Sequence, residues 1–236
     1  MTLTLLEVGQ PRAALRRRFP DYPEMFEDLL TPHMPGLTVE TVRISSGDAY
    51  PDPKKLNAVL ITGSPFGVYD DLPWMAGLFD FIRWCAYEGV KQVGICFGHQ
   101  AMAQAFGGQV IKSPKGWGIG RHRYQITAHQ DWMGPEGDDS FALAVSHQDQ
   151  VIEAPPGAEI IARSEFCPLA GLKYSQGPAV SFQGHPEFSD AFAAALYENR
   201  RGDPLGDEEV VAALASLSSS HDNERVGKWI ADFLVI

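Results

Sequence analysis

One cysteine lies between two glycines where a predicted strand gives way to a predicted helix. The segment 90–93 is apolar-leaning, 101–106 suits a helix, and between them stands Gly94-Ile95-Cys96-Phe97-Gly98-His99-Gln100. A strand–turn–helix with a nucleophile at its apex strains the apex backbone and brings the residues two positions before and after it close together, so both must be small. The helix N-terminus also favours a thiolate. The pattern therefore indicates a nucleophilic cysteine, although a core cysteine with glycines that admit a packed helix fits it equally well.

A cysteine nucleophile needs a base to take its proton and return it to the leaving group. His185 is the candidate among seven histidines, because it follows a predicted strand in the run Phe182-Gln183-Gly184-His185-Pro186-Glu187. Glu187 is near enough to orient the imidazole and stabilise its charged form. The candidate catalytic set is Cys96, His185 and Glu187, while His-Pro-Glu by itself is also typical of a surface turn.

The elements that must position these residues fall into two patterns along the chain. The first half alternates predicted strands with helices, which favours a parallel, doubly wound sheet. After Gly108 short strand candidates follow one another, which indicates added antiparallel strands, and residues 188–236 are predicted to be helical. We expect one domain over 1–236. The expected strands are 2–8, 37–44, 57–62, 90–93, 121–128, 141–146, 160–164, 169–174 and 179–182; the expected helices lie within 11–30 and over 74–87, 101–106, 191–197, 208–217 and 225–234.

Composition excludes several classes of protein. The net charge of −11 argues against a general nucleic-acid binder and against binding to an anionic membrane surface. Three cysteines without framework spacing, no evident signal peptide and no run of about 20 apolar residues favour a cytoplasmic protein. His33, His129 and His221 lack partners at metal spacing, so we expect no metal and no cofactor.

Together these motifs resemble the class I (triad) glutamine amidotransferase family. The cysteine and histidine motifs lie about 90 residues apart. With the loop Thr62-Gly63-Ser64-Pro65 and the run Ser146-His147-Gln148-Asp149, they occur along the chain in the same order as in the family. The resemblance covers most of residues 55–190 and is greatest to stand-alone members related to the glutaminase domain of GMP synthase. It implies a three-layer, flavodoxin-like α/β fold whose mixed sheet has a parallel core. We expect no fused ATP-pyrophosphatase domain, because no Gly-rich phosphate loop follows.

The resemblance also implies a reaction. Cys96 would attack a γ-glutamyl amide to give a γ-glutamyl thioester, and His185 would protonate the leaving amine and then activate water. The oxyanion would be held by the backbone N–H groups of Phe97 and Ser64. The family commonly has glycine where Ser64 stands, and serine keeps that N–H.

The resemblance also implies which residues bind the substrate. Gln100 can both donate and accept hydrogen bonds, which suits the zwitterionic end of a γ-glutamyl group, and Asp149 could meet its α-ammonium. His99 is expected to be structural. The loop Lys115–Gly120 has Gly118 where the family usually carries an acid. The implied substrate-binding set is Gln100, Gly63, Ser146, His147 and Asp149.

Several functions remain open from the sequence. The chain could be a glutaminase that delivers ammonia to a separate synthase subunit, or a self-sufficient γ-glutamyl peptidase acting on glutathione-like or γ-glutamyl-amine compounds. It could also be a catalytically silent binding or regulatory module on the same fold. A redox-sensor cysteine would need Cys85 or Cys167 as a resolving partner.

Overall fold

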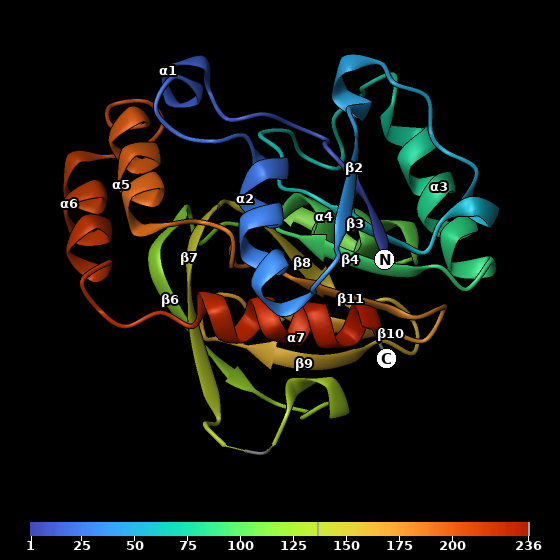
Figure 1. Cartoon of the computed structure of the whole chain (residues 1–236). Coiled ribbons are helices and arrows are strands. Elements are labelled where there is room, and N and C mark those ends of the chain that lie inside the picture. Colours follow the sequence, from blue (N-terminus) through green and yellow to red (C-terminus); the bar gives the residue numbers. More distant parts are fainter. Residues whose placement is uncertain (136, 236) are drawn as a thin grey trace.

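A nine-stranded mixed sheet forms the centre of the computed structural model, which describes residues 1–135 and 137–235 (Figure 1). The strand order is β2-β1-β3-β4-β11-β10-β9-β6-β7. The first five strands in this order pair in parallel and the others pair antiparallel. The parallel strands are β2 (Thr38–Val42), β1 (Thr2–Leu6), β3 (Ala58–Ile61), β4 (Lys91–Ile95) and β11 (Ala179–Phe182); the antiparallel ones are β10 (Gly171–Tyr174), β9 (Glu159–Arg163), β6 (Gly118–Ile126) and β7 (Ser140–His147).

Helices cover both faces of the parallel half, because its strands carry apolar residues on both sides. Leu3, Leu5 and Leu60 face one side, where they join one apolar cluster with α2 (Tyr22–Leu30) and α7 (Asn223–Val235). Leu6 and Ile61 face the other side, with α3 (Met75–Tyr87) and α4 (Phe97–Ala105). Figure 1 shows α2 and α7 in front of the sheet. The predicted three-layer α/β fold with a parallel core and added antiparallel strands is confirmed.

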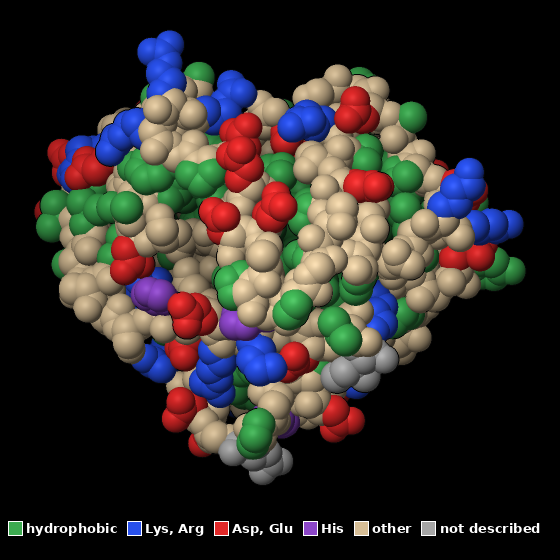
Figure 2. Space-filling view, in the orientation of Figure 1, with side chains coloured by type: hydrophobic (Ala, Val, Ile, Leu, Met, Phe, Trp, Pro, Cys, Tyr) green, Lys and Arg blue, Asp and Glu red, His purple; other side chains and the backbone are tan. Residues whose placement is uncertain are grey.

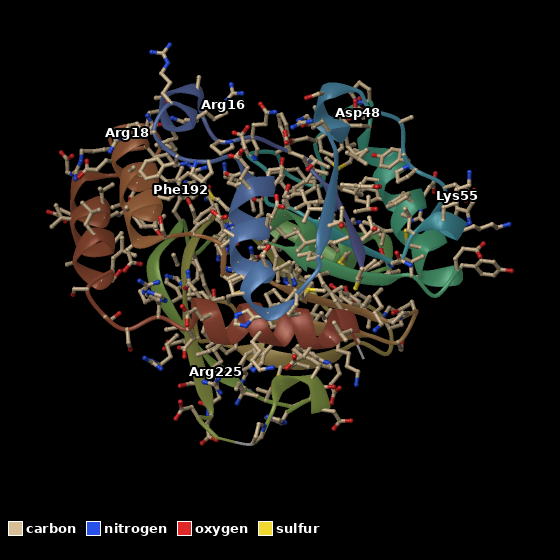
Figure 3. All side chains as sticks on the ribbon, in the orientation of Figure 1. Arg16, Arg18, Asp48, Lys55, Phe192 and Arg225 are labelled. Atoms are coloured by element: carbon tan, nitrogen blue, oxygen red, sulfur yellow. The ribbon has the colours of Figure 1, made fainter. Side chains whose placement is uncertain are left out.

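A third apolar cluster lies beside the antiparallel strands. It joins α1 (Ala13–Arg16), α5 (Asp190–Asn199) and α6 (Asp207–Ser216) to the start of α2. Phe192 of α5 points towards α2 (Figure 3), where its ring centroid lies 6.3 Å from that of Tyr22. This cluster fixes the C-terminal end of α5 near the edge of the sheet where the parallel strands end, which is where the candidate site forms.

The structure departs most from the predicted elements in three places, and the other elements differ from their predicted bounds by two residues or fewer at each end. The helix after Cys96 begins at Phe97 rather than at 101, because the turn before it is a single residue. The strand predicted at 121–128 is β6 (Gly118–Ile126). Two strands were missed, β5 (Gln109–Lys112) and β8 (Asp149–Glu153), which form a separate two-stranded sheet. Both are short and bury only part of their residues, so neither shows the alternation that would identify a strand.

Candidate active site

The site forms where three adjacent parallel strands end at the same edge of the sheet. β3 and β11 flank β4 on its two sides, and the backbone N–H of Cys96 donates to the carbonyl of Phe182 at 2.9 Å. Residues that follow these strands therefore meet, although more than 120 residues separate Gly63 from His185 along the chain. Ligand sites of open parallel sheets gather at this edge.

Cys96 stands alone between β4 and α4 in a strained conformation. Its φ of 53° is the only positive value at a non-glycine residue in 1–135 and 137–235. A Cβ on Gly94 would lie 2.6 Å from the backbone of Gly98, and one on Gly98 would overlap the carbonyl oxygen of Ile61. The predicted sharp turn and the need for both glycines are confirmed. Backbone strain of this kind is a common feature of functional sites.

His185 and Glu187 form a buried pair beside the thiol. The Nδ1–H of His185 donates to Oε1 of Glu187 at 2.7 Å, and both side chains are at most 4% exposed. The backbone N–H of His185 donates to the carbonyl of Ala144 on β7, which fixes the segment. The ring of Phe188 lies parallel to the imidazole, with the centroids 3.8 Å apart. The imidazole is thus held in one orientation with Nε2 free to act.

The electrostatics of this pair favour a charged imidazole. Burial opposes the imidazolium, but the charges of Glu187 and Cys96 outweigh it and raise the pKa of His185 to about 10. Oε2 of Glu187 has no hydrogen-bond partner in the described part of the chain. His185 is therefore the chief compensation for that buried carboxylate.

The loop after β3 lies against both reactive groups. A Cβ on Gly63 would lie 3.0 Å from Cε1 of His185 and 3.8 Å from Cβ of Cys96. The Ser64 hydroxyl donates to the carbonyl of Val8 at 2.8 Å, which anchors the loop to the segment that follows β1. Among the described residues, nothing accepts a hydrogen bond from the backbone N–H of Ser64 or of Phe97. Both predicted oxyanion donors are available.

A cavity of about 310 Å³, which we call the acidic cavity, opens on one side of Cys96. Two carboxylates, those of Asp70 and Asp149, line it together with the ammonium group of Lys112. The Tyr69 hydroxyl donates to Oδ1 of Asp149 at 2.8 Å. Burial raises the pKa of Asp149, an effect that Tyr69 and Lys112 oppose. The other lining residues are Ser64, Pro65, Phe66, Gly67, Cys96, Gln100, Trp117, Ser146, His147, Gln148 and Arg200.

Gln100 and His147 both hold the backbone of Asp149. Nε2 of Gln100 donates to the Asp149 carbonyl at 2.9 Å and to Oε1 of Gln183 at 3.1 Å, so only its own oxygen is left to face a ligand. Nδ1 of His147 lies 3.0 Å from the same carbonyl and must be its donor. Burial lowers the pKa of His147 to about 3, which keeps it neutral. Two residues predicted to contact substrate thus also fix the position of a third.

His99 points away from Cys96, as expected for a structural residue. Its Nδ1 lies 2.7 Å from Oγ of Ser181, and the side chain is fully buried. Burial lowers its pKa to about 3, so it is a neutral core histidine.

A second cavity of about 210 Å³, which we call the basic cavity, opens on the side of Cys96 where His185 lies. Arg200, at the C-terminal end of α5, donates from Nη1 to Oγ of Ser146 at 2.7 Å and lies 5.0 Å above the Trp117 ring. Neither Arg200 nor Trp117 was predicted, since an arginine at a helix end is ordinary. The other lining residues are Gln10, Pro11, Arg12, Tyr22, Ser64, Pro65, Cys96, Ser146, His185, Phe188, Leu196 and Pro204.

The glycine that departs from the family pattern has a steric reason. A Cβ on Gly118 would lie 2.6 Å from the Phe166 ring and 3.2 Å from Nε2 of His147. An acidic side chain would not fit there. The loop instead contributes Trp117 to both cavities.

The structure brings all ten predicted site residues together at this edge of the sheet. Within residues 1–135 and 137–235, no group of three or more His, Cys, Asp or Glu side chains is arranged to hold a metal ion. Across the same residues, every helix is too short or too polar to cross a bilayer.

Comparison with known proteins gives the family. The model of the class-I glutamine amidotransferase family matches residues 33–199. A glutamine amidotransferase-like protein of Schizosaccharomyces pombe is 29% identical, over 99% of this chain and 98% of its own length. Gamma-glutamyl peptidase 3 of Arabidopsis thaliana is 28% identical over 74% of this chain and 72% of its own. A crystal structure of a glutamine amidotransferase from Thermotoga maritima superposes with a TM-score of 0.76 at 19% identity, over 100% of this chain and 96% of that one, which supports the fold. The chain belongs to the class I glutamine amidotransferase family.

Proposed function

We propose that the protein hydrolyses γ-glutamyl amides through a γ-glutamyl thioester on Cys96. The observation that carries this proposal is the strained Cys96 turn beside the buried pair of His185 and Glu187. A thiol, an oriented imidazole and two backbone N–H groups without acceptors make up the set that acyl transfer from an amide requires.

The first half of the reaction breaks the amide. The Cys96 thiolate attacks the δ-carbon of the γ-glutamyl group, and the N–H groups of Phe97 and Ser64 stabilise the oxyanion. The C–N bond then breaks as the imidazolium of His185 gives its proton to the leaving nitrogen. In the second half, neutral His185 takes a proton from water, which attacks the thioester and releases glutamate and the thiolate.

The acidic cavity suits the amino-acid end of such a substrate. The Asp149 carboxylate and the free oxygen of Gln100 both line it, and each can accept a hydrogen bond from an α-ammonium group. Asp149→Asn should therefore raise KM about tenfold or more while lowering kcat less, because the lost interaction is made in both ground and transition states.

Hydrolysis by the purified protein tests the proposal. Glutamate release from glutamine and from γ-glutamyl amides should fall below detection in Cys96→Ala, with the circular dichroism spectrum unchanged. Cys85→Ala is the matched control, because it removes a buried thiol of α3 that lines neither cavity. Wild-type rates in Cys96→Ala would overturn the mechanism. Lack of turnover by the wild-type protein on all of these compounds would favour the silent binding module.

The alternative of a redox sensor finds no support in the other two thiols. Burial raises the pKa of both Cys85 and Cys167 to about 12, which keeps them protonated and unreactive.

A further inference from the structure

The two cavities beside Cys96 differ in charge. The acidic cavity is lined by two carboxylates as well as by Lys112 and Arg200, whereas the basic cavity is lined by Arg12 and Arg200 and has no carboxylate among its lining residues.

The two arginines of the basic cavity lie close together without an anion between them. Nη1 of Arg12 donates to the carbonyl of Asn199 at 3.3 Å, directly before Arg200 in the chain. Neither arginine forms a salt bridge within the described residues, so no carboxylate of these residues occupies the space between them. Burial and the nearby charge of Arg12 lower the pKa of Arg200, while the negative charge that Tyr22 or Cys96 can carry opposes this.

Arg200 is partly buried and Arg12 is exposed, so solvent screens part of their mutual repulsion, and a ligand anion bound to both would compensate the rest. The site is also built rather than incidental. Arg200 is held by Ser146 and by the face of Trp117, and only its Nη1 is committed to a protein acceptor in the described chain. The rest of its planar fork is free to bind a carboxylate, for which an arginine is better suited than a lysine.

The position of the basic cavity identifies which part of a substrate would enter it. It contains His185, which gives the proton to the leaving nitrogen, whereas the acidic cavity does not. A γ-glutamyl group in the acidic cavity therefore places its leaving group in the basic one. Tyr22 and Phe188, with ring centroids 6.0 Å apart, form an apolar wall there.

We propose that the basic cavity is a leaving-group subsite in which Arg200 and Arg12 bind a carboxylate carried by the leaving amine. This inference rests on the proposed function and names its substrate class: γ-glutamyl amino acids and peptides with a free carboxylate. Hydrolysis then releases glutamate and an amino acid or peptide. Glutamine, whose leaving group is ammonia, leaves the subsite empty and is a poor substrate.

γ-Glutamyl-glycine and γ-glutamyl-glycinamide form a matched pair of substrates, because they differ only in the carboxylate of the leaving group. We expect wild-type kcat/KM to be at least about tenfold higher for γ-glutamyl-glycine, the scale of one charge-assisted hydrogen-bond pair. Arg12→Gln and Arg200→Gln should each reduce this ratio several-fold, and Arg200→Lys should restore part of it.

Arg17→Gln is the control for charge. It removes one positive charge from the end of α1, is exposed, and lines neither cavity. Figure 2 shows how basic side chains gather over α1, so a general effect of that surface would appear equally in Arg17→Gln. The ratio should stay at the wild-type value in this variant.

The outcomes separate the inference from the proposed function. No hydrolysis of either compound would overturn the proposed function. Equal kcat/KM for both compounds in the wild-type protein would overturn the subsite alone. Equal losses on both compounds in Arg200→Gln, with no change of the ratio in Arg12→Gln, would also overturn it, because Arg200 would then bind the α-carboxylate of the γ-glutamyl group.

Discussion

Replacement of Glu187 by glutamine tests whether its charge sets the protonation of His185. Oε1 of Glu187 lies 2.7 Å from Nδ1 of His185, and both side chains are buried. Two unit charges at that separation interact by about 6 kcal/mol at an effective dielectric constant of about 20. One pKa unit corresponds to about 1.4 kcal/mol, so the charge of Glu187 can raise the pKa of His185 by at most about 4 units. Glutamine still offers an oxygen to the Nδ1–H, and we expect the pKa of His185 to fall by about 2 units.

The sign of the effect follows from the reaction. The imidazolium form of His185 protonates the leaving amine, so kcat/KM falls on the alkaline side as His185 loses its proton. In the wild-type protein this alkaline limb should lie far above 6.5, because the pKa of His185 is raised to about 10. In Glu187→Gln the limb should move to lower pH by about 2 units, and the maximal rate should fall by about 10²-fold or more.

The assay is the pH profile of kcat/KM for a γ-glutamyl amide. Glu208→Gln on exposed α6 makes the same chemical change away from the site and should keep the wild-type profile. An alkaline limb in Glu187→Gln that coincides with the wild-type limb would refute the assignment of that limb to His185 and of its position to Glu187.

Three further predictions concern the frame around the thiol. Gly98→Ala should destabilise the protein by about 3 kcal/mol in urea unfolding, because the new Cβ would overlap the carbonyl oxygen of Ile61 at the end of β3. Gly137→Ala, the control, should be neutral, and equal stabilities of the two variants would contradict the close approach of Gly98 to Ile61. Gly63→Ala should lower kcat about tenfold with little loss of stability, since its Cβ would lie 3.0 Å from Cε1 of His185; a wild-type kcat would show that the imidazole has room to move. Stability should fall as the pH drops below 6.5, because the pKa of His99 is about 3 in the folded protein and 6.5 in the unfolded chain, so only the unfolded chain takes up the proton. At about pH 5 this lowers the free energy of unfolding by about 2 kcal/mol, and His99→Gln should lose that part of the decline between about pH 7.5 and about pH 5. An identical decline in the variant would assign the effect to other groups.

The part of the site that could be predicted from the sequence is the part that depends on local geometry. Cys96 and its two glycines are constrained by one turn, and His185 and Glu187 are two residues apart. The parallel half of the sheet could be predicted from the alternation of strand and helix candidates along the chain, because parallel strands need helical crossovers between them.

The walls of the cavities could not be predicted, because they come from segments with no local signal. Arg200 ends a helix in which an arginine is ordinary, and Tyr22 begins another. The pairing of a short strand, β8, with β5 sets the position of Asp149, and neither strand has a clear pattern of apolar residues. Only the packing of α1 and α5 beside the sheet brings Arg12 close to Arg200.

The most direct test of the central claim is peptide mass spectrometry of the wild-type protein, quenched in acid during steady-state turnover of a γ-glutamyl amide. We predict one glutamyl residue added to the peptide that contains Cys96, and neither this adduct nor glutamate release in Cys96→Ala. A glutamyl adduct on any other residue, or wild-type turnover by Cys96→Ala, would contradict the thioester mechanism.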